Sequence, residues 1–489
     1  MSTKSLSRRR LLGYAGALSA TLALEACGGG AATSAPAATT AKPTTGAAAT
    51  TAPTTGVAAA TSAPAATTAG SAAAGAPTAA TTATKAAGNV DWWTTAGADI
   101  GSQPDQEAFV AAFQKSAAGA TVKVKPTFLP DDGFSEKMTT VLATGSGVPD
   151  VSTFFNGDWF PQATDLRDYI ARDKVDLNQF SKIHFDTRCR FGDKIIGMPI
   201  GVGATMYYYN TTLFDKAGLK APQWGYTTDQ YLQDAIKMSD RSKKVFGTSM
   251  PKAWRGEFFA FGARPFSDDG AKVDGYLNGP KTQKAYEFMY DLANSGAVPT
   301  AAEFDVIKTE GTGPLDLFNT GRLGFAGLNN GQFQIVDKAG VKFGLIHNPQ
   351  APGEDVVTNG WTLQLGIPTA SKNKDAAWEY LKWMTTEPGQ KFLMLQNHGF
   401  TPTIPALWKE HPAAADPRLQ FFFKILETRQ VWEFAGRFPY FGKVTRTSQE
   451  LLDKIYLGKV KRGDIKAELD ALVPPTQKVL DEERAKLKV

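Results

Sequence analysis

Cysteine is almost absent from this chain of 489 residues, which contains only Cys27 and Cys189. Two cysteines give no disulfide framework, so the fold must depend on its hydrophobic core. The sequence also lacks a Gly-x-Ser-x-Gly elbow, a phosphate-binding loop and a His-Glu-x-x-His motif. Its four histidines are too scattered to predict a metal site by spacing. We therefore expect no metal, no cofactor and no enzymatic activity.

Concentrated positive charge is missing as well. The 53 Lys and Arg residues nearly balance the 48 Asp and Glu residues, which leaves a formal net charge of +5. No dense basic run follows residue 10. Nucleic-acid binding requires a concentrated basic face, so the charge pattern argues against that function.

The N-terminus has the features of an export signal. A basic segment at residues 4–10 precedes an apolar stretch at residues 11–24, which is shorter than the roughly 20 residues of a permanent membrane span. Residues 7–12 (SRRRLL) resemble a twin-arginine signal, and residues 24–27 (LEAC) resemble a lipobox, with Glu25 in place of the usual small residue. We expect a signal peptide over residues 1–26 and a lipid on Cys27; secretion with an unmodified Cys27 is the alternative.

Large apolar residues are nearly missing from residues 27–88, which consist almost entirely of Ala, Thr, Pro, Ser and Gly. Such a segment cannot bury enough apolar surface to offset its chain entropy. Its scattered prolines favour a partly extended spacer. The sequence therefore predicts a disordered tether between the lipid and a globular body that begins near residue 89.

Strand and helix patterns alternate in this body. Strands are expected at residues 90–94, 122–125 and 151–155, and helices lie between them. One helix has Phe109, Val110 and Phe113 on its apolar face, with Asp105 as its cap. Another, at residues 375–384, is amphipathic, with an apolar stripe at Ala377, Tyr380, Leu381 and Met384. This order predicts an α/β fold with a largely parallel sheet, and about 400 residues are too many for one sheet, so we expect two lobes.

Six segments in order resemble the family 1 extracellular solute-binding proteins, relatives of the maltose-binding protein. They are residues 93–95 (WTT), 142–151 (LATGSGVPDV), 193–199 (DKIIGMP), 208–219 (YYNTTLFDKAGL), 318–325 (FNTGRLGF) and 359–361 (NGW). The resemblance covers nearly the whole body, from residue 90 to about residue 483. It implies the fold of type II periplasmic binding proteins, in which crossover strands join two α/β lobes around a ligand cleft.

The resemblance also implies a domain plan. One lobe would comprise residues 89–201 and 359–412, and the other residues 202–358 and 413–489. The crossing at residues 199–203 suits a hinge, because Gly201 and Gly203 can absorb backbone rotation.

Sugar recognition needs aromatic rings for the apolar faces of the pyranose and polar groups for its hydroxyls. By the resemblance, Trp361 is the best candidate for stacking, since it opens a lobe-crossing strand. Other candidates lie in loops after strands, where open α/β sheets bind ligands. The expected ligand-binding residues are Thr95, Asn156, Asp158, Trp159, Trp254, Asn330, Trp361 and Tyr440, and Asp99 is a further candidate.

The implied function is that of a substrate-binding lipoprotein of an ABC importer, which captures a carbohydrate by lobe closure and passes it to permease subunits. It would be a monomer, anchored by lipid to the outer face of the cell membrane. Three alternatives stay open. The same fold could bind an anion such as a glycerol phosphate diester or an acidic sugar through Arg255 and Arg437, or ferric iron through residues 207–209 (YYY). From other classes, the chain could be a carbohydrate-active enzyme or a scaffold without ligand.

Overall fold

The computed structural model describes residues 86–95, 100–309, 313–396, 400–431, 434 and 437–487. The chain divides after residue 80, and only its second unit, residues 81–489, contains described residues. The expected signal peptide, Cys27, the expected tether up to residue 85, and Asp99 therefore lie outside the described residues. No helix in the described part is long and apolar enough to cross a membrane.

The first lobe is built on two parallel strands, β1 (Gly88–Thr95) and β2 (Val122–Leu129). On the other side of β1, Trp92 forms a parallel bridge to Val151. The next residues form β3 (Ser152–Thr153), which pairs antiparallel with β9 (Val357–Gly366). A short hairpin, β4 (Arg190–Phe191) and β5 (Lys194–Ile195), follows. The helices are α1 (Gln103–Gln114), α2 (Asp131–Thr144), η1 (Gly157–Gln162), α3 (Arg167–Asp173), η2 (Leu177–Gln179), α4 (Lys182–Arg188), α12 (Lys374–Thr385), α13 (Glu387–Gln396) and η5 (Pro405–Glu410).

Local sequence explains where these helices begin and which face they bury. The carboxylate of Asp105 accepts a hydrogen bond from the backbone N–H of Ser102 at 2.9 Å. Ser102 is therefore the N-cap of α1 and Asp105 is its third helical residue, so the helix begins about one turn earlier than the predicted cap at Asp105. The predicted apolar face of α1 and the predicted stripe of α12 are both buried, which confirms the two amphipathic helices.

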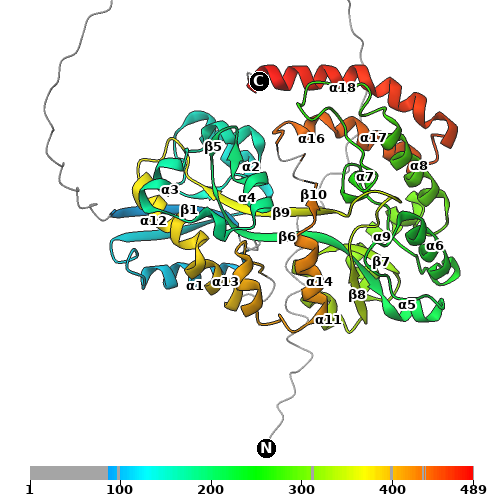
Figure 1. The fold of residues 1–489 in the computed structure, drawn as a ribbon, viewed down its shortest axis with the longest axis horizontal. Helices are drawn as coiled ribbons and strands as arrows, with labels where there is room; N and C mark the ends of the chain where they lie inside the picture. The colour runs from blue at the N-terminus through cyan, green and yellow to red at the C-terminus, as the bar shows by residue number, and fades with distance from the viewer. Residues whose placement is uncertain are drawn as a thin grey trace, which may run out of the picture. The chain divides into compact units, whose positions relative to one another are not determined.

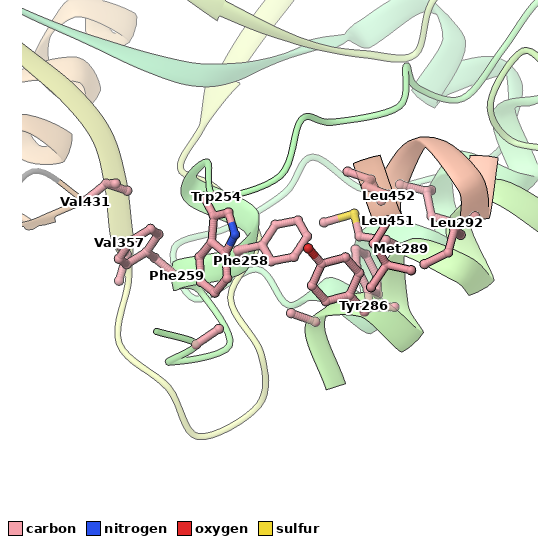
Figure 2. Packing of buried hydrophobic residues seen from close by; sticks show 14 of the residues in the cluster. Trp254, Phe258, Phe259, Tyr286, Met289, Leu292, Val357, Val431, Leu451 and Leu452 are labelled. Atoms are coloured by element: carbon pink, nitrogen blue, oxygen red, sulfur yellow. The ribbon is translucent and has the colours of Figure 1, made fainter. Parts of the chain in front are cut away.

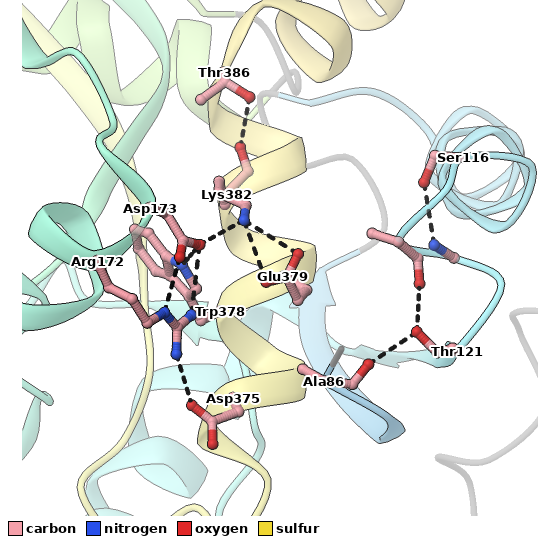
Figure 3. Close-up of polar contacts among 12 residues, drawn as sticks. Ala86, Ser116, Thr121, Arg172, Asp173, Asp375, Trp378, Glu379, Lys382 and Thr386 are labelled. Carbon is pink, nitrogen blue, oxygen red and sulfur yellow. Dashed lines mark hydrogen bonds and ion pairs between the residues drawn. The ribbon is translucent and has the colours of Figure 1, made fainter. Parts of the chain in front are cut away.

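A cluster of charged side chains fastens α3 to α12 within this lobe (Figure 3). Asp173, the last residue of α3, accepts hydrogen bonds from Arg172, from the Trp378 indole at 2.8 Å and from Lys382. These donors hold the pKa of Asp173 well below its usual range, although burial raises it. The carboxylate therefore stays charged and joins two helices.

Two long strands cross from the first lobe to the second (Figure 1). β6 (Met198–Asn210) pairs antiparallel with β9 over Met198–Thr205. Its second half pairs antiparallel with β7 (Phe325–Asn329) and β8 (Phe343–Ile346) of the second lobe. The sheet is therefore mixed, and the expectation of a largely parallel sheet is wrong, because the two crossing strands run in opposite directions. A third segment runs beside them, since the N–H of Val202 donates to the carbonyl of Thr401 at 2.9 Å.

Helices cover the second lobe, and an aromatic core fills it. Figure 2 shows part of this core, where Trp254, Phe258, Phe259 and Tyr286 pack between β9 and the helices. The helices are α5 (Thr211–Lys216), α6 (Thr228–Met238), η3 (Arg241–Lys243), α7 (Gly256–Phe259), α8 (Pro280–Asn294), α9 (Ala301–Thr309), α10 (Pro314–Asn319), η4 (Asn330–Gln332), α11 (Phe333–Ala339), α14 (Pro417–Leu426), α16 (Phe441–Val444), α17 (Arg446–Tyr456), η6 (Arg462–Asp464) and α18 (Ile465–Leu487); β10 (Arg429–Gln430) pairs in parallel with β9.

The buried hydrophobic residues fall into distinct clusters, of which one fills the first lobe and another fills the second. One cluster gathers Trp92, Phe109, Trp378 and Tyr380, and others gather the aromatic residues around Phe258 and around Tyr208. Two α/β lobes are thus present, which confirms the predicted fold class. The predicted lobe boundaries remain predictions.

Candidate functional site

The two lobes are joined where β6 and β9 lie side by side. Gly203 of β6 is paired with Trp361 of β9. A Cβ atom on Gly203 would lie 2.3 Å from Cζ2 of Trp361 and 2.7 Å from Oδ1 of Asn330. A Cβ on Gly201 would lie 2.7 Å from the Phe400 ring. Neither glycine has a positive φ, so the backbone conformation does not require glycine at these positions. The absence of a side chain instead leaves room for the rings of Trp361 and Phe400, in addition to any part in a hinge.

Two of the predicted site residues therefore come together at this crossing. The half-buried ring of Trp361 lies over the backbone of Gly203, and Oδ1 of Asn330 accepts a hydrogen bond from the N–H of Ala204 at 3.3 Å. Asn330 begins η4, directly after β7. The arrangement offers an aromatic surface and an amide at the point that both lobes share.

The first lobe contributes the segment after β3, where three site residues were predicted. Asn156 caps η1, and its Oδ1 accepts from the N–H of Asp158 at 3.1 Å. Asp158 is exposed and forms an ion pair with Lys443. Trp159 is only 1% exposed, and its indole N–H donates to Thr139 at 3.0 Å. Trp159 is thus a satisfied core residue in this conformation, and its contact with a ligand stays a prediction.

Phe155 is an exposed aromatic residue that the sequence reasoning missed. It lies just after β3 and is 47% exposed, while its neighbour Phe154 is fully buried. Its ring packs against Phe134 at 5.9 Å and Trp159 at 4.8 Å between centroids. The sequence assigned Phe155 to a buried strand. The alternation of neighbouring side chains between inside and outside was the signal that could have identified it.

The second lobe contributes the loop before α7. Trp254 adopts a positive φ of 55°, a strained conformation for a large residue, and is 4% exposed. Nε1 of Trp254 and Oε2 of Glu257 are buried atoms without a hydrogen-bond partner in the described part of the chain. Oε1 of Glu257 accepts from the hydroxyl of Tyr207 at 2.6 Å. Burial raises the pKa of Glu257, and the Tyr207 hydrogen bond partly offsets this effect.

The remaining predicted residues, Thr95 and Tyr440, contact side chains and carbonyls other than those at the crossing. Thr95 is half-buried at the end of β1, and its carbonyl accepts from the Gln106 side chain at 2.8 Å. Tyr440 is 3% exposed, packs on Phe266 and donates its hydroxyl to the carbonyl of Gly270 at 3.3 Å. Tyr440 is therefore a core residue of the second lobe in this conformation, and its contact with a ligand stays a prediction.

Two of the three tyrosines considered for iron, Tyr207 and Tyr208, are buried and already hydrogen-bonded. Tyr207 donates to Glu257, and Tyr208 donates to the carbonyl of Asn329 at 2.9 Å. Burial raises the pKa of both phenols, which opposes the phenolate that iron coordination needs. Among the described residues, no group of three or more His, Cys, Asp or Glu side chains could hold a metal ion. Arg437, considered for anions, lies 3.7 Å from the carboxylate of Asp268.

Two α/β lobes, joined by crossing strands with the Trp361 ring on one strand and the Asn330 amide beside the other, define the chain as a two-lobed binding-protein fold. The chain belongs to the bacterial extracellular solute-binding protein family, whose model matches residues 98–391.

Relatives agree with this assignment. A binding protein of Brucella abortus is 27% identical over 281 residues, which are 54% of this chain and 64% of that protein. The arabinooligosaccharide-binding protein of Halalkalibacterium halodurans is 24% identical over 41% of this chain and 45% of its own length. The chain thus spans less than two thirds of these relatives. An ABC substrate-binding protein of Listeria monocytogenes, solved with cycloalternan, matches 82% of this chain and 99% of its own with a TM-score of 0.67 at 20% identity, and so shares the fold.

Proposed function

We propose that this protein captures a carbohydrate between its two lobes and delivers it to an ABC importer. The observation that carries the proposal is the ring of Trp361 over Gly203, beside Asn330, on the strands that join the lobes. An indole face matches the apolar C–H face of a sugar ring, and an amide matches its hydroxyls. The arabinooligosaccharide-binding relative supports a carbohydrate as the ligand class.

The loop before α7 supplies the polar complement. Nε1 of Trp254 and Oε2 of Glu257 are both buried in the described conformation, so a sugar hydroxyl, which both donates and accepts, would reach them only if the loop before α7 moved. A buried polar atom without a partner costs about 1–3 kcal/mol, and a ligand that satisfies both atoms recovers that cost. Asn156 and the exposed ring of Phe155 would meet the same ligand from the first lobe.

Capture then follows from the two-lobed geometry. A ligand that touches both lobes contacts them simultaneously only when they are closed, so it shifts the equilibrium toward the closed form. The closed form would be the one that permease subunits accept. The protein works as a monomer in this scheme and leaves its ligand chemically unchanged.

The N-terminal segments would keep the receptor near its permease. We infer lipid attachment at Cys27 after removal of residues 1–26, which would anchor the protein at the outer face of the cell membrane. The Ala/Thr/Pro-rich segment up to residue 85 would then act as a tether and raise the effective concentration of receptor at the importer.

Calorimetric titration of the purified chain tests the proposal. The panel contains mono- and oligosaccharides, a glycerol phosphate diester and ferric citrate. We expect saturable binding of one sugar class without its consumption. Trp361→Ala should weaken that binding about tenfold or more, a loss of about 1.4 kcal/mol. Trp224→Ala is the matched control, because Trp224 is an exposed tryptophan that packs with His347 and Phe421 and is not among the predicted ligand-binding residues.

Two outcomes would contradict the sugar assignment. Binding of only the phosphate diester or iron would keep the binding-protein fold and replace the ligand class. Equal affinities for the Trp361→Ala and Trp224→Ala variants would remove Trp361 from the site. Turnover of a bound glycan would instead indicate an enzyme.

A further inference from the structure

Lys443 bridges the two lobes. It belongs to α16 of the second lobe, and its Nζ lies 3.0 Å from Oδ2 of Asp158 in η1 of the first lobe. The same Nζ lies 2.9 Å from Oε2 of Glu483 in α18 of the second lobe. One ammonium group therefore connects a carboxylate of each lobe.

The backbones of the two lobes touch beside this bridge. A Cβ atom on Gly157, in η1, would lie 2.2 Å from both Cα and Cβ of Pro439. The φ of Gly157 is not positive, so its backbone conformation does not require glycine. Glycine is needed there only because the second lobe comes so close. The ion pair thus lies at a tight contact and not across open solvent.

The charges at the bridge fit a contact that can form and separate. The side chains of Lys443 and Asp158 are 48% and 44% exposed, whereas that of Glu483 is 10% exposed. Burial raises the pKa of Glu483, but hydrogen bonds from Lys486 and Lys443 outweigh it and lower the pKa overall. Glu483 thus holds Lys443 in place from its own lobe, and Asp158 is the partner that arrives from the other lobe.

We propose that Lys443 is a latch that holds the two lobes together by pairing with Asp158, and that Asp158 acts on ligand capture through this lobe contact without touching the ligand. The role of the latch in ligand capture rests on the proposed function, whereas the pairing of the lobes by Lys443 can be tested without it. The latch acts in the chain alone, so it can be measured without any ligand.

Energy transfer between the lobes provides the measurement. Dyes are placed on the full chain at Asp132→Cys in the first lobe and Asp481→Cys in the second, both exposed positions, with Cys27→Ser to prevent extra labelling. Cys189 is fully buried and does not need replacement. The ratio of the short to the long inter-lobe distance is recorded at 50 mM and 1 M sodium chloride, without ligand.

Lys443→Gln should lower the ratio of closed to open molecules about threefold at 50 mM salt, as expected for an exposed ion pair, and 1 M salt should lower the wild-type ratio toward the same value. Lys486→Gln is the matched control, because Lys486 pairs with Glu483 within α18 alone. Asp158→Asn combined with Lys443→Gln should have no more effect than either change singly.

Three results would overturn the latch. They are a wild-type chain that shows only the long distance, equal effects of Lys443→Gln and Lys486→Gln, and additive effects of Lys443→Gln and Asp158→Asn. Thermal unfolding of each variant confirms that it is folded. Because no ligand is present, failure of the latch leaves the carbohydrate proposal standing, and failure to bind sugar leaves the latch standing.

Discussion

The charged clusters around Asp173 and Lys443 use the same chemistry in two different places. At Asp173, the carboxylate is 17% exposed, and all its partners belong to the first lobe (Figure 3). At Lys443, the ammonium group is 48% exposed, and its partners belong to both lobes. One cluster also includes a neutral donor, the Trp378 indole, whereas the other consists only of ionised groups.

This difference in burial predicts that the Asp173 cluster affects the stability of the fold, whereas the Lys443 cluster affects the movement of the lobes. A charge that is buried with several donors is costly to leave unpaired, so its loss is felt as loss of fold stability. An exposed ion pair has little net energy, so it can break without unfolding either lobe. The first cluster is suited to hold helices together, and the second to bias an equilibrium between arrangements of the lobes.

His184 adds a third case to the two charged clusters, because it contacts elements of both lobes but is neutral. This residue of α4 is 2% exposed, and its Nδ1 lies 3.1 Å from Oγ1 of Thr362 in β9. Burial lowers its pKa from the ordinary 6.5 to about 4, and the carbonyl of Leu426 offsets part of that shift. As the pH falls below 6.5, the imidazole of His184 therefore becomes protonated in the unfolded chain but stays neutral in the folded chain. Stability due to the neutral ring is lost from pH 6.5 down to about 4, by about 3 kcal/mol in total.

The measurement is urea unfolding at pH 7, 6, 5 and 4.5 for the wild type and His184→Gln. The variant should lose less stability on acidification, and the difference between the two curves isolates His184 from the other titrating groups. Parallel curves would mean that the His184 pKa is not shifted in the fold.

Asp173→Asn breaks the intra-lobe cluster and should lower the free energy of unfolding by about 2 kcal/mol at pH 7, since it weakens charge-assisted hydrogen bonds from Lys382 and Arg172. The folded-state pKa of Asp173 lies below its usual value. Its contribution is therefore complete above the unfolded pKa of about 4 and is lost as the pH falls further, so wild type and variant should converge in acid. Urea unfolding measures the loss, and the inter-lobe distance should stay unchanged. A change in that distance would erase the distinction between the two clusters.

Gly157→Ala tests the lobe contact by sterics in place of charge. A Cβ atom 2.2 Å from Pro439 forces the two backbones apart, and we expect the ratio of closed to open molecules to fall about tenfold, equivalent to about 1.4 kcal/mol. The free energy of unfolding should hardly change. Gly442→Ala is the control, because its Cβ would meet nothing within 4 Å although it adjoins Lys443. An unchanged ratio in Gly157→Ala would show that the lobes do not approach this closely in solution.

The sequence was sufficient for the two-lobed fold class but not for the strand directions of the sheet, and the ligand-binding residues stay predictions. Periodicity identified α1 and α12, and the motif order identified the two lobes, because such patterns depend on many residues at once. Side-chain exposure at single loop positions could not be read in this way. Trp159, Tyr440 and Phe155 are all aromatic residues in or beside loops, yet only Phe155 is exposed. The partnership of Asp158 with Lys443 spans 285 positions, so only the packing of the lobes could reveal it.

The smallest expected effect comes from Asp375, which lies at the edge of the Asp173 cluster, and it is compared with the effect of Asp173 at the centre. Asp375 lies 3.3 Å from Arg172 on the outer side of the cluster, and its side chain is 70% exposed. Water solvates this carboxylate in the folded and unfolded chain alike, so Asp375→Asn should lower the free energy of unfolding by less than about 0.5 kcal/mol. Urea unfolding beside Asp173→Asn measures the contrast. If both variants lost equal stability, the cluster would act through its summed charge and not through burial of Asp173. The Asp173 cluster and the Lys443 bridge would then differ only in whether they join one lobe or two, and their different exposure to solvent would not explain their different effects.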